Sequence, residues 1–567
     1  MVNSWLHPPS LHPRSTHHEV TIAPHPHRNP AYLVKADHGA VASENSVCSS
    51  IGVDVLKDGG NAVDAMISTA LCIGVVNMFS SGIGGGGFMT VRIPPSTPNG
   101  ASEVWTIDFR ETAPALSNET MYIKDPTQSL FGGLSVGVPG EVKGLEEAHR
   151  RWGRLDWKRL VRPNVELAAG WTVGRELGRR INSFRPLMLG NKDWSDIFAP
   201  EGTILKEGDT IKRTNLSRTL AAIAEGGSEA FYRGEIAQAI SDKVRAEGGI
   251  LTLEDMANYE VKVEKALQGT YKGRKVYVPP APTSGPVLLH MLNIMEAYDL
   301  VGEGQTPLNA HRVVEAIKFG FAARTRICDP DFNDQPERID EIPRKSFSAH
   351  IVKNLTDDRT HPPAYYQPIF DVPEDHGTSH SSVIDKDGMA ASITTTVNLV
   401  FGSQVLDPIT GIIMNDEMAD FSTPGTPNPF GLWPSPFNYP EPGKRPLSST
   451  VPTIVEESDG SLLLAIGGSG GSRIFPSVFQ VLLNLDWGYD ISAAIEFGRL
   501  HDQLYPSYVD ADDIYPSDLL DGLRKRGHNL TLSDVNRVAA VINGVLVKNG
   551  TLYAASDSRK NGVAAGY

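Results

Sequence analysis

The sequence changes character at Thr378, and this change limits the folds open to the chain. From about residue 140 to residue 330, apolar residues recur at helical spacing. The helices expected there include 142–152, 216–225, 236–246, 286–297 and 310–323. After Thr378, two pairs of strand-like runs are joined by turn residues, and each pair is typical of a β-hairpin. The pairs are 378–384 with 389–397, and 450–455 with 462–466. Two more helices are expected over 476–485 and 491–498.

A polar, proline-rich stretch over residues 357–377 precedes the first of these strands and is typical of an exposed linker. A threonine hydroxyl is a weak nucleophile, but a threonine at the start of a chain can use its own α-amine as the base. The linker followed by Thr378 therefore suits a cleavage site in front of a nucleophile. An ordinary β-branched residue at the start of a strand fits the same pattern.

A glycine-rich segment, 82–87, invites comparison with a dinucleotide-binding loop. Such a loop follows a strand and opens a helix, whereas this segment follows an apolar helix and opens a strand at 88–93. We therefore reject nucleotide binding. Consecutive glycines here are more consistent with two backbones in close approach, or with a floor of N–H groups beside a site.

Composition excludes several other classes of protein. The net charge of −15 argues against a nucleic-acid partner, because phosphate binding needs a basic surface. No run approaches the roughly 20 apolar residues that span a bilayer, and no signal peptide is visible, so a soluble protein is expected. Asn-x-Ser/Thr sequons leave a secretory or vacuolar location, and glycosylation, open.

Three cysteines, Cys48, Cys72 and Cys328, form neither a disulfide framework nor a zinc-ligand spacing, and Cys72 is expected to be a buried thiol. The Pro- and His-rich residues 1–35 are interpreted as a disordered or variable extension. A metal-binding tail is the alternative that we consider for them.

The segment Gly377-Thr378-Ser379-His380 and the residues after it, up to 388, resemble the nucleophile segment of the γ-glutamyltranspeptidases, or glutathione hydrolases. Further ordered similarity runs from about residue 36 to the end of the chain, at 60–65, 81–86, 138–141, 444–449, 467–472 and 557–567. The resemblance implies an α+β fold, the four-layer αββα sandwich of N-terminal-nucleophile hydrolases. It also implies a large subunit, 36–377, and a small subunit, 378–567, that form a heterodimer from one precursor.

The resemblance also assigns roles to single residues. Thr378 would cut the preceding peptide bond and then act as the nucleophile, Thr396 would tune it, and the amides of Gly470 and Gly471 would form the oxyanion hole. The remaining residues would bind the amino-acid end of a γ-glutamyl donor. They are Arg110 and the hydroxyls of Ser448 and Ser449 for its carboxylate, Glu417 and Asp420 for its ammonium group, and Asn398.

Taken alone, Arg110, Glu417 and Asp420 are also typical of a solvated strand end and turn. Residues 424–443 have the length of the family's cover over the donor site, and Phe430 falls where some members have an aromatic gate. Thr283-Ser284-Gly285-Pro286 departs from the family's usual pattern, which we attribute to local packing.

The resemblance predicts an autoprocessing γ-glutamyltransferase and glutathione hydrolase. It would take the γ-glutamyl group from glutathione or its conjugates and pass it to water, an amino acid or a dipeptide, with no metal or organic cofactor. Two alternatives stay open at this point. One is a related acylase that accepts another acyl group, such as glutaryl. The other is an unprocessed, non-catalytic relative that serves as a binding protein.

Overall fold

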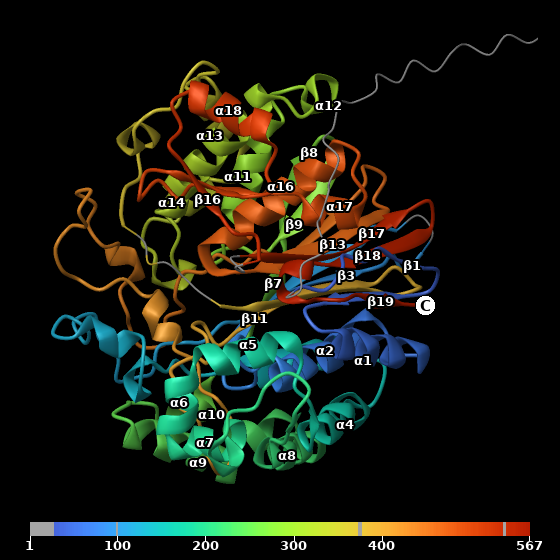
Figure 1. Ribbon diagram of the computed structural model, residues 1–567, viewed down its shortest axis with the longest axis vertical. Coiled ribbons are helices and arrows are strands. Elements are labelled where there is room, and N and C mark those ends of the chain that lie inside the picture. The colour runs from blue at the N-terminus through green and yellow to red at the C-terminus, as the bar shows by residue number, and fades with distance from the viewer. Residues whose placement is uncertain (1–27, 98–99, 372, 374–376, 537–539) are drawn as a thin grey trace, which may run out of the picture.

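The computed structural model describes residues 28–97, 100–371, 373, 377–536 and 540–567, and it has four layers (Figure 1). Two seven-stranded antiparallel sheets face each other in the middle, and helices cover both outer faces. The predicted α+β class and αββα sandwich are therefore confirmed.

The first sheet carries the β-hairpin that starts after Thr378. Its strands, in spatial order, are β19 (Ala565–Gly566), β2 (Ala40–Ser43), β10 (Ser379–Ile384), β11 (Ala390–Thr396), β3 (Gly86–Ile93), β4 (Glu103–Phe109) and β7 (Lys262–Lys265). The hairpin therefore lies in the centre of the sheet, paired on both sides by strands from the first part of the chain.

The second sheet contains the other predicted hairpin. Its order is β1 (Val34–Ala36), β18 (Thr551–Ser556), β17 (Val541–Lys548), β13 (Leu462–Ser469), β12 (Thr453–Glu456), β9 (Arg274–Val278) and β8 (Leu267–Tyr271). Because β1 begins at Val34, ordered chain starts ahead of the predicted boundary at residue 36. Of the predicted extension, residues 1–27 lie outside the described residues.

The interior between the sheets holds small and larger apolar side chains. Ala40, Ala42 and Ala465 are buried there beside Ile454 and Leu552. Strands β10 and β13 pack against each other across this interior, which sets the position of the candidate site.

Helices on the first sheet include α1 (Ser46–Lys57), α2 (Ala62–Val76) and α3 (Glu141–Trp152). Outside them lie α4 (Trp157–Ala168), α8 (Thr214–Tyr232), α9 (Gly234–Ala246) and α10 (Leu253–Asn258), in the lower half of Figure 1. Every residue of α2 is buried. A capping box of Asn61 and Asp64 satisfies the first amides of α2, as burial without water requires.

Helices on the second sheet include α11 (Gly285–Met295), α16 (Ile474–Asp486) and α17 (Ile491–Glu496). Beyond them lie α13 (Pro307–Arg324), α15 (Lys345–Val352) and α18 (Ser517–Lys525). A small sheet of β14 (Leu500–His501), β15 (Val509–Asp512) and β16 (Leu530–Ser533) packs beside α13. The predicted helices in both halves of the chain are confirmed, with boundaries shifted by a few residues.

The prediction of a buried thiol at Cys72 is wrong, because Cys48 and Cys72 form a disulfide with Cα atoms 5.3 Å apart. Helices α1 and α2 pack against each other as a hairpin, so the first turn of one lies beside the end of the other. Periodicity indicates the helix that carries Cys72 but not its pairing with the helix that carries Cys48. Cys328 is buried as a free cysteine.

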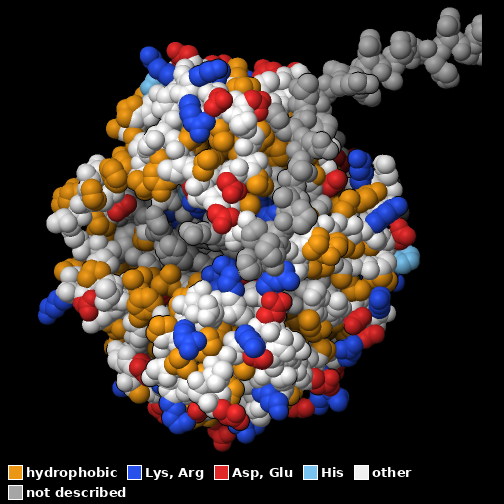
Figure 2. Space-filling view, in the orientation of Figure 1, with side chains coloured by type: hydrophobic (Ala, Val, Ile, Leu, Met, Phe, Trp, Pro, Cys, Tyr) orange, Lys and Arg blue, Asp and Glu red, His pale blue; other side chains and the backbone are white. Residues whose placement is uncertain are grey.

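The surface shown in Figure 2 carries Lys and Arg interspersed with Asp and Glu, without a broad patch of one sign. Among the residues that the structure describes, no helix combines the length and apolar character that crossing a bilayer requires.

Candidate active site

Thr378 lies immediately before β10, where the two sheets meet, and is 5% exposed. The backbone N–H of Gly470, at the end of β13, donates to Thr378 Oγ1 at 3.0 Å. The same N–H lies 3.3 Å from the carbonyl oxygen of Gly377. One amide thus contacts both the hydroxyl and the carbonyl of the peptide bond in front of it.

The backbone at this peptide bond lies outside the ordinary regions. Thr378 has φ +106°, which a β-branched residue rarely adopts, and such a conformation costs on the order of 1–3 kcal/mol. Gly377 has φ +68°, and a Cβ added there would lie 1.7 Å from the carbonyl oxygen of Asn398. The dense contacts around the peptide bond hold it in this shape.

Thr396 and Asn398 lie at the end of β11, next to Thr378. The antiparallel register pairs Ser379 with Thr395, so its continuation places Thr378 beside Thr396. Thr396 Oγ1 accepts the backbone N–H of Asn398 at 2.7 Å, and the Asn398 side chain donates to Asp420 Oδ1 at 3.0 Å. Asn398 therefore connects the threonines to the acidic segment 416–420.

Arg110, which follows β4, is buried together with Glu417 and Asp420. Its guanidinium pairs with Glu417 and, at 2.6 Å, with Asp420 Oδ2, and it donates to the carbonyl of Leu447 at 2.9 Å. The expectation of a solvated charge and turn is thereby excluded. The sequence analysis assigns Arg110 to the carboxylate of a substrate, and Glu417 and Asp420 to its ammonium group. In the structure, Arg110 pairs with these two carboxylates directly.

Burial and charge shift the pKa values of the ionisable groups around Arg110. Burial alone would lower the pKa of Arg110, but the charges of Glu417 and Asp420 outweigh it and raise that pKa. Burial raises the pKa of Glu417 and of Asp416 well above the usual range, and that of Glu111 to about 7. Arg110 pairs with Glu417 and Asp420, and its charge also acts on Glu111. Sequence reasoning missed Glu111, although it directly follows Arg110.

Ser448 and Ser449 are buried in the segment that follows Leu447. Ser448 Oγ lies 3.0 Å from Thr450 Oγ1, and the carbonyl of Ser448 accepts from Ser284 Oγ at 2.9 Å. Ser284 belongs to the tetrapeptide 283–286, which departs from the family pattern. This tetrapeptide therefore packs against the backbone of the serine pair. Gly471 follows Gly470 with φ +60° and opens a short 3₁₀ turn.

Sequence reasoning also missed a buried ion pair beneath Thr378. Lys560 Nζ donates to the carbonyl oxygen of Thr378 at 2.9 Å and pairs with Glu44 at 2.5 Å. Glu44 in turn accepts the backbone N–H of His380 at 3.1 Å and the hydroxyl of Ser469 at 2.5 Å. A lysine within the C-terminal motif 557–567 was the available signal, but its partner lies more than 500 residues away in the sequence.

The glycine-rich segment lies under the end of β11, as close backbone packing predicts. A Cβ on Gly85 would lie 1.9 Å from the carbonyl oxygen of Thr396, and one on Gly84 would lie 2.1 Å from that of Ile413. Next to it, Ser81 contacts Thr395, and Ser80 Oγ lies 2.8 Å from Ser379 Oγ. This segment thus supports the backbone of the candidate nucleophile.

The linker and the predicted cover, residues 424–443, touch each other. The backbone N–H of Asp371 donates to the carbonyl of Trp433 at 2.8 Å, and Phe430 stacks on Tyr505 with centroids 4.3 Å apart. Asp371 and Tyr505, together with Leu432 of the cover and Ser472, line a pocket of about 310 Å³ beside the glycine pair. A larger cavity, of about 1100 Å³, lies among the hairpin turns at the opposite edge and has none of the site residues in its lining.

Residues 48–567 of this chain match the family model described as "Gamma-glutamyltranspeptidase". The chain belongs to this family. It is 43% identical to glutathione hydrolase proenzyme 1 of Schizosaccharomyces pombe over 546 residues, which cover 94% of this chain and 85% of the relative.

Solved structures agree with this assignment. Helicobacter pylori γ-glutamyltranspeptidase aligns with a TM-score of 0.54 at 32% identity, over 57% of this chain and 93% of that one. A cephalosporin acylase from Bacillus halodurans aligns over 97% of this chain and 99% of that chain, with a TM-score of 0.83 at 24% identity. The acylase therefore supports the fold alone.

Proposed function

We propose that this chain is an autoprocessing γ-glutamyltransferase and glutathione hydrolase whose nucleophile is Thr378. The observation that carries the proposal is the Gly470 amide, which contacts both the Thr378 hydroxyl and the Gly377 carbonyl. The product would be a heterodimer of residues up to 377 and residues 378–567.

Autocleavage follows from this arrangement. Thr378 Oγ1 attacks the Gly377 carbonyl carbon, and the oxygen that becomes negative is the one facing the Gly470 N–H. A donor at this position is worth on the order of 3 kcal/mol of barrier. The C–N bond breaks, the amine of Thr378 takes a proton, and water hydrolyses the resulting ester. Cleavage also removes the constraint that holds Thr378 at φ +106°, so strain favours the reaction.

Acyl transfer reuses the same groups. The freed α-amine of Thr378 accepts the hydroxyl proton while Oγ1 attacks the γ-amide carbon of the donor. The amide C–N bond breaks, and the departing amine takes the proton. Water or an acceptor amine then attacks the ester, and Thr378 recovers its proton. The amides of Gly470 and Gly471 would stabilise both oxyanions.

Donor recognition would come from the buried charges. The α-carboxylate of a γ-glutamyl group would pair with Arg110, and Ser448 and Ser449 would donate hydroxyls to it. The α-ammonium group would pair with Glu417 and Asp420. Asn398 would bind the same amino-acid end of the donor. Because carboxylates outnumber cations there, an acyl group without the ammonium would leave them uncompensated. This favours γ-glutamyl over glutaryl substrates.

Two anilides test the substrate class, since γ-glutamyl and glutaryl p-nitroanilide differ only in the α-amino group. Hydrogen bonds to charged groups are worth about 1.5–3 kcal/mol each, so kcat/KM for the γ-glutamyl compound should be about 100-fold higher or more. Asp420→Asn should reduce that ratio. Equal rates, or faster release from the glutaryl compound, would favour the acylase instead.

A further inference from the structure

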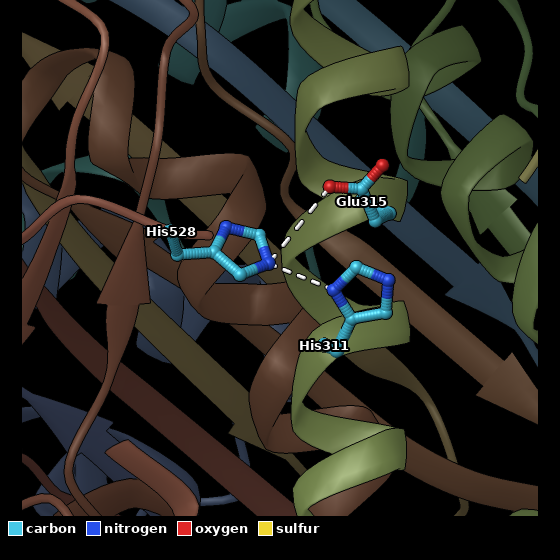
Figure 3. Close-up of side chains that lie close together, drawn as sticks. All are labelled: His311, Glu315 and His528. Carbon is cyan, nitrogen blue, oxygen red and sulfur yellow. Dashed lines mark hydrogen bonds and ion pairs between the residues drawn. The ribbon is translucent and has the colours of Figure 1, made fainter. Parts of the chain in front are cut away.

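His311, Glu315 and His528 form a cluster of side chains (Figure 3) that includes none of the site residues described above. His311 and Glu315 are one turn apart on α13, and His528 lies between α18 and β16. All three side chains are buried, and one nitrogen or oxygen of each lies within 4.8 Å of the others. His311 Nδ1 lies 2.7 Å from His528 Nε2, which lies 3.9 Å from Glu315 Oε1.

Further contacts orient these atoms as in a metal site. His311 Nε2 donates to the carbonyl of Thr356 at 2.7 Å, which leaves the lone pair of Nδ1 facing the cluster. The two oxygens of Glu315 accept the hydroxyls of Thr360 and Tyr366, each at 2.7 Å. Metal-binding histidines and carboxylates in proteins are held by such second bonds.

The protonation state of the two imidazoles is also suitable for a metal ion. Burial lowers the pKa of both imidazoles, that of His311 to about 4, so both are in the neutral form that binds metals. Lys318 Nζ lies 4.0 Å from Glu315 and 3.5 Å from Asp502, whose side chain is also buried. Arg526 is a further cation whose charge acts on both imidazoles, and Asp357 is a further carboxylate that acts on His311.

We propose that His311 Nδ1, His528 Nε2 and Glu315 Oε1 bind one divalent transition-metal ion of the Zn²⁺ class. Two nitrogens and an oxygen are ligands that Zn²⁺ takes, with a fourth position for water. Tetrahedral Zn²⁺ with bonds of about 2.0–2.1 Å needs ligand atoms roughly 3.3 Å apart. The separations of 2.7 and 3.9 Å lie on either side of that value and the third is within 4.8 Å, so the side chains would have to shift by about 1 Å to reach this geometry.

Binding exchanges one hydrogen bond for coordination. Because His311 Nδ1 has no proton when its Nε2 donates to Thr356, the proton between the two rings belongs to His528 Nε2. That proton moves to His528 Nδ1, a buried atom without a hydrogen-bond partner among the described residues, so the ring stays neutral.

The ion would join three segments that are distant in the sequence. α13 and the linker residues Thr356 and Thr360 precede the proposed cleavage site, and His528 follows it. After cleavage, a claim that rests on the proposed function, the ion would link the two subunits without touching Thr378. Metal binding itself does not require cleavage, so the two proposals can fail separately.

The test compares zinc content by mass spectrometry after gel filtration for the full-length wild type and for His528→Gln, Glu315→Gln and His361→Gln. His361 is the matched control, because it contacts Thr356 Oγ1 at 2.9 Å but lies outside the cluster. Histidines within residues 1–27 are common to all four proteins, so their contribution cancels. We expect wild type and His361→Gln to hold one zinc equivalent more than the other two variants, and zinc to raise the melting temperature of only the first pair.

Equal zinc content in all four folded proteins would overturn the proposal. If the cluster variants do not fold, crystals of the wild type soaked in Zn²⁺ decide the matter. An anomalous-scattering peak between His311 Nδ1 and His528 Nε2 is expected, and its absence would refute the site.

Discussion

Replacing Arg110 by lysine tests how the donor is recognised. The guanidinium binds Asp420 and Glu417 and also reaches the carbonyls of Pro446 and Leu447. Lysine keeps the charge, but its single ammonium cannot serve these partners and a substrate carboxylate together. Losing one hydrogen bond between charged groups costs about 1.5–3 kcal/mol, so kcat/KM should fall about 10- to 150-fold. The loss should appear mainly in KM, because Arg110 lies away from the scissile amide.

Arg92→Lys is the matched control for this measurement. Arg92 is also buried, pairs with Glu456 at 2.7 Å and donates to the carbonyls of Gly388 and Gly460, but at the far end of the sheet. Initial rates with γ-glutamyl p-nitroanilide should give the wild-type KM for Arg92→Lys. An unchanged KM for Arg110→Lys, or an equal rise in both variants, would refute the assignment of Arg110 to the donor carboxylate.

Three further predictions follow from the geometry. Gly377→Ala should block autocleavage, since its Cβ would lie 1.7 Å from the Asn398 carbonyl oxygen; two fragments on a denaturing gel would contradict this. Lys560→Met should lower kcat about 10- to 150-fold. It should also move the acidic limb of the kcat/KM profile to higher pH, because removing a cation beside Thr378 raises the pKa of the Thr378 amine. An acidic limb at the wild-type pH would contradict this role of Lys560. Cys48→Ala with Cys72→Ala should destabilise the chain by about 3 kcal/mol, seen as a lower melting temperature that dithiothreitol no longer changes; an equal melting temperature would show that the bond contributes nothing.

Local patterns in the sequence predict most of the elements that hold the site. Helix α13 begins where Thr306 caps the first turn and Pro307 follows it, and the hairpin β10–β11 turns at 385–388 as its turn residues indicate. These features depend on residues close together in the chain. The predicted cover, 424–443, contacts Asp371 and Tyr505, and its closure over the donor stays a prediction.

Contacts between distant segments could not be predicted in the same way. Periodicity indicates the apolar helix that carries Cys72, but it does not show that this helix packs against the one that carries Cys48. Glu44 likewise has no local pattern that points to Lys560. From its local sequence alone, Arg110 is typical of a solvated charge at the end of a strand. Only the fold shows that β4 ends beside Glu417 and Asp420. His311 and His528 are likewise joined only by the fold.

The central claim is that Thr378 cuts the bond before it and becomes the nucleophile. The most direct measurement is a denaturing gel with intact mass and N-terminal sequencing of wild type and Thr378→Ala. The account predicts two wild-type fragments, the smaller beginning at Thr378, and a single uncut chain in the variant. An uncut wild type, or a variant cut at the same bond, would contradict it.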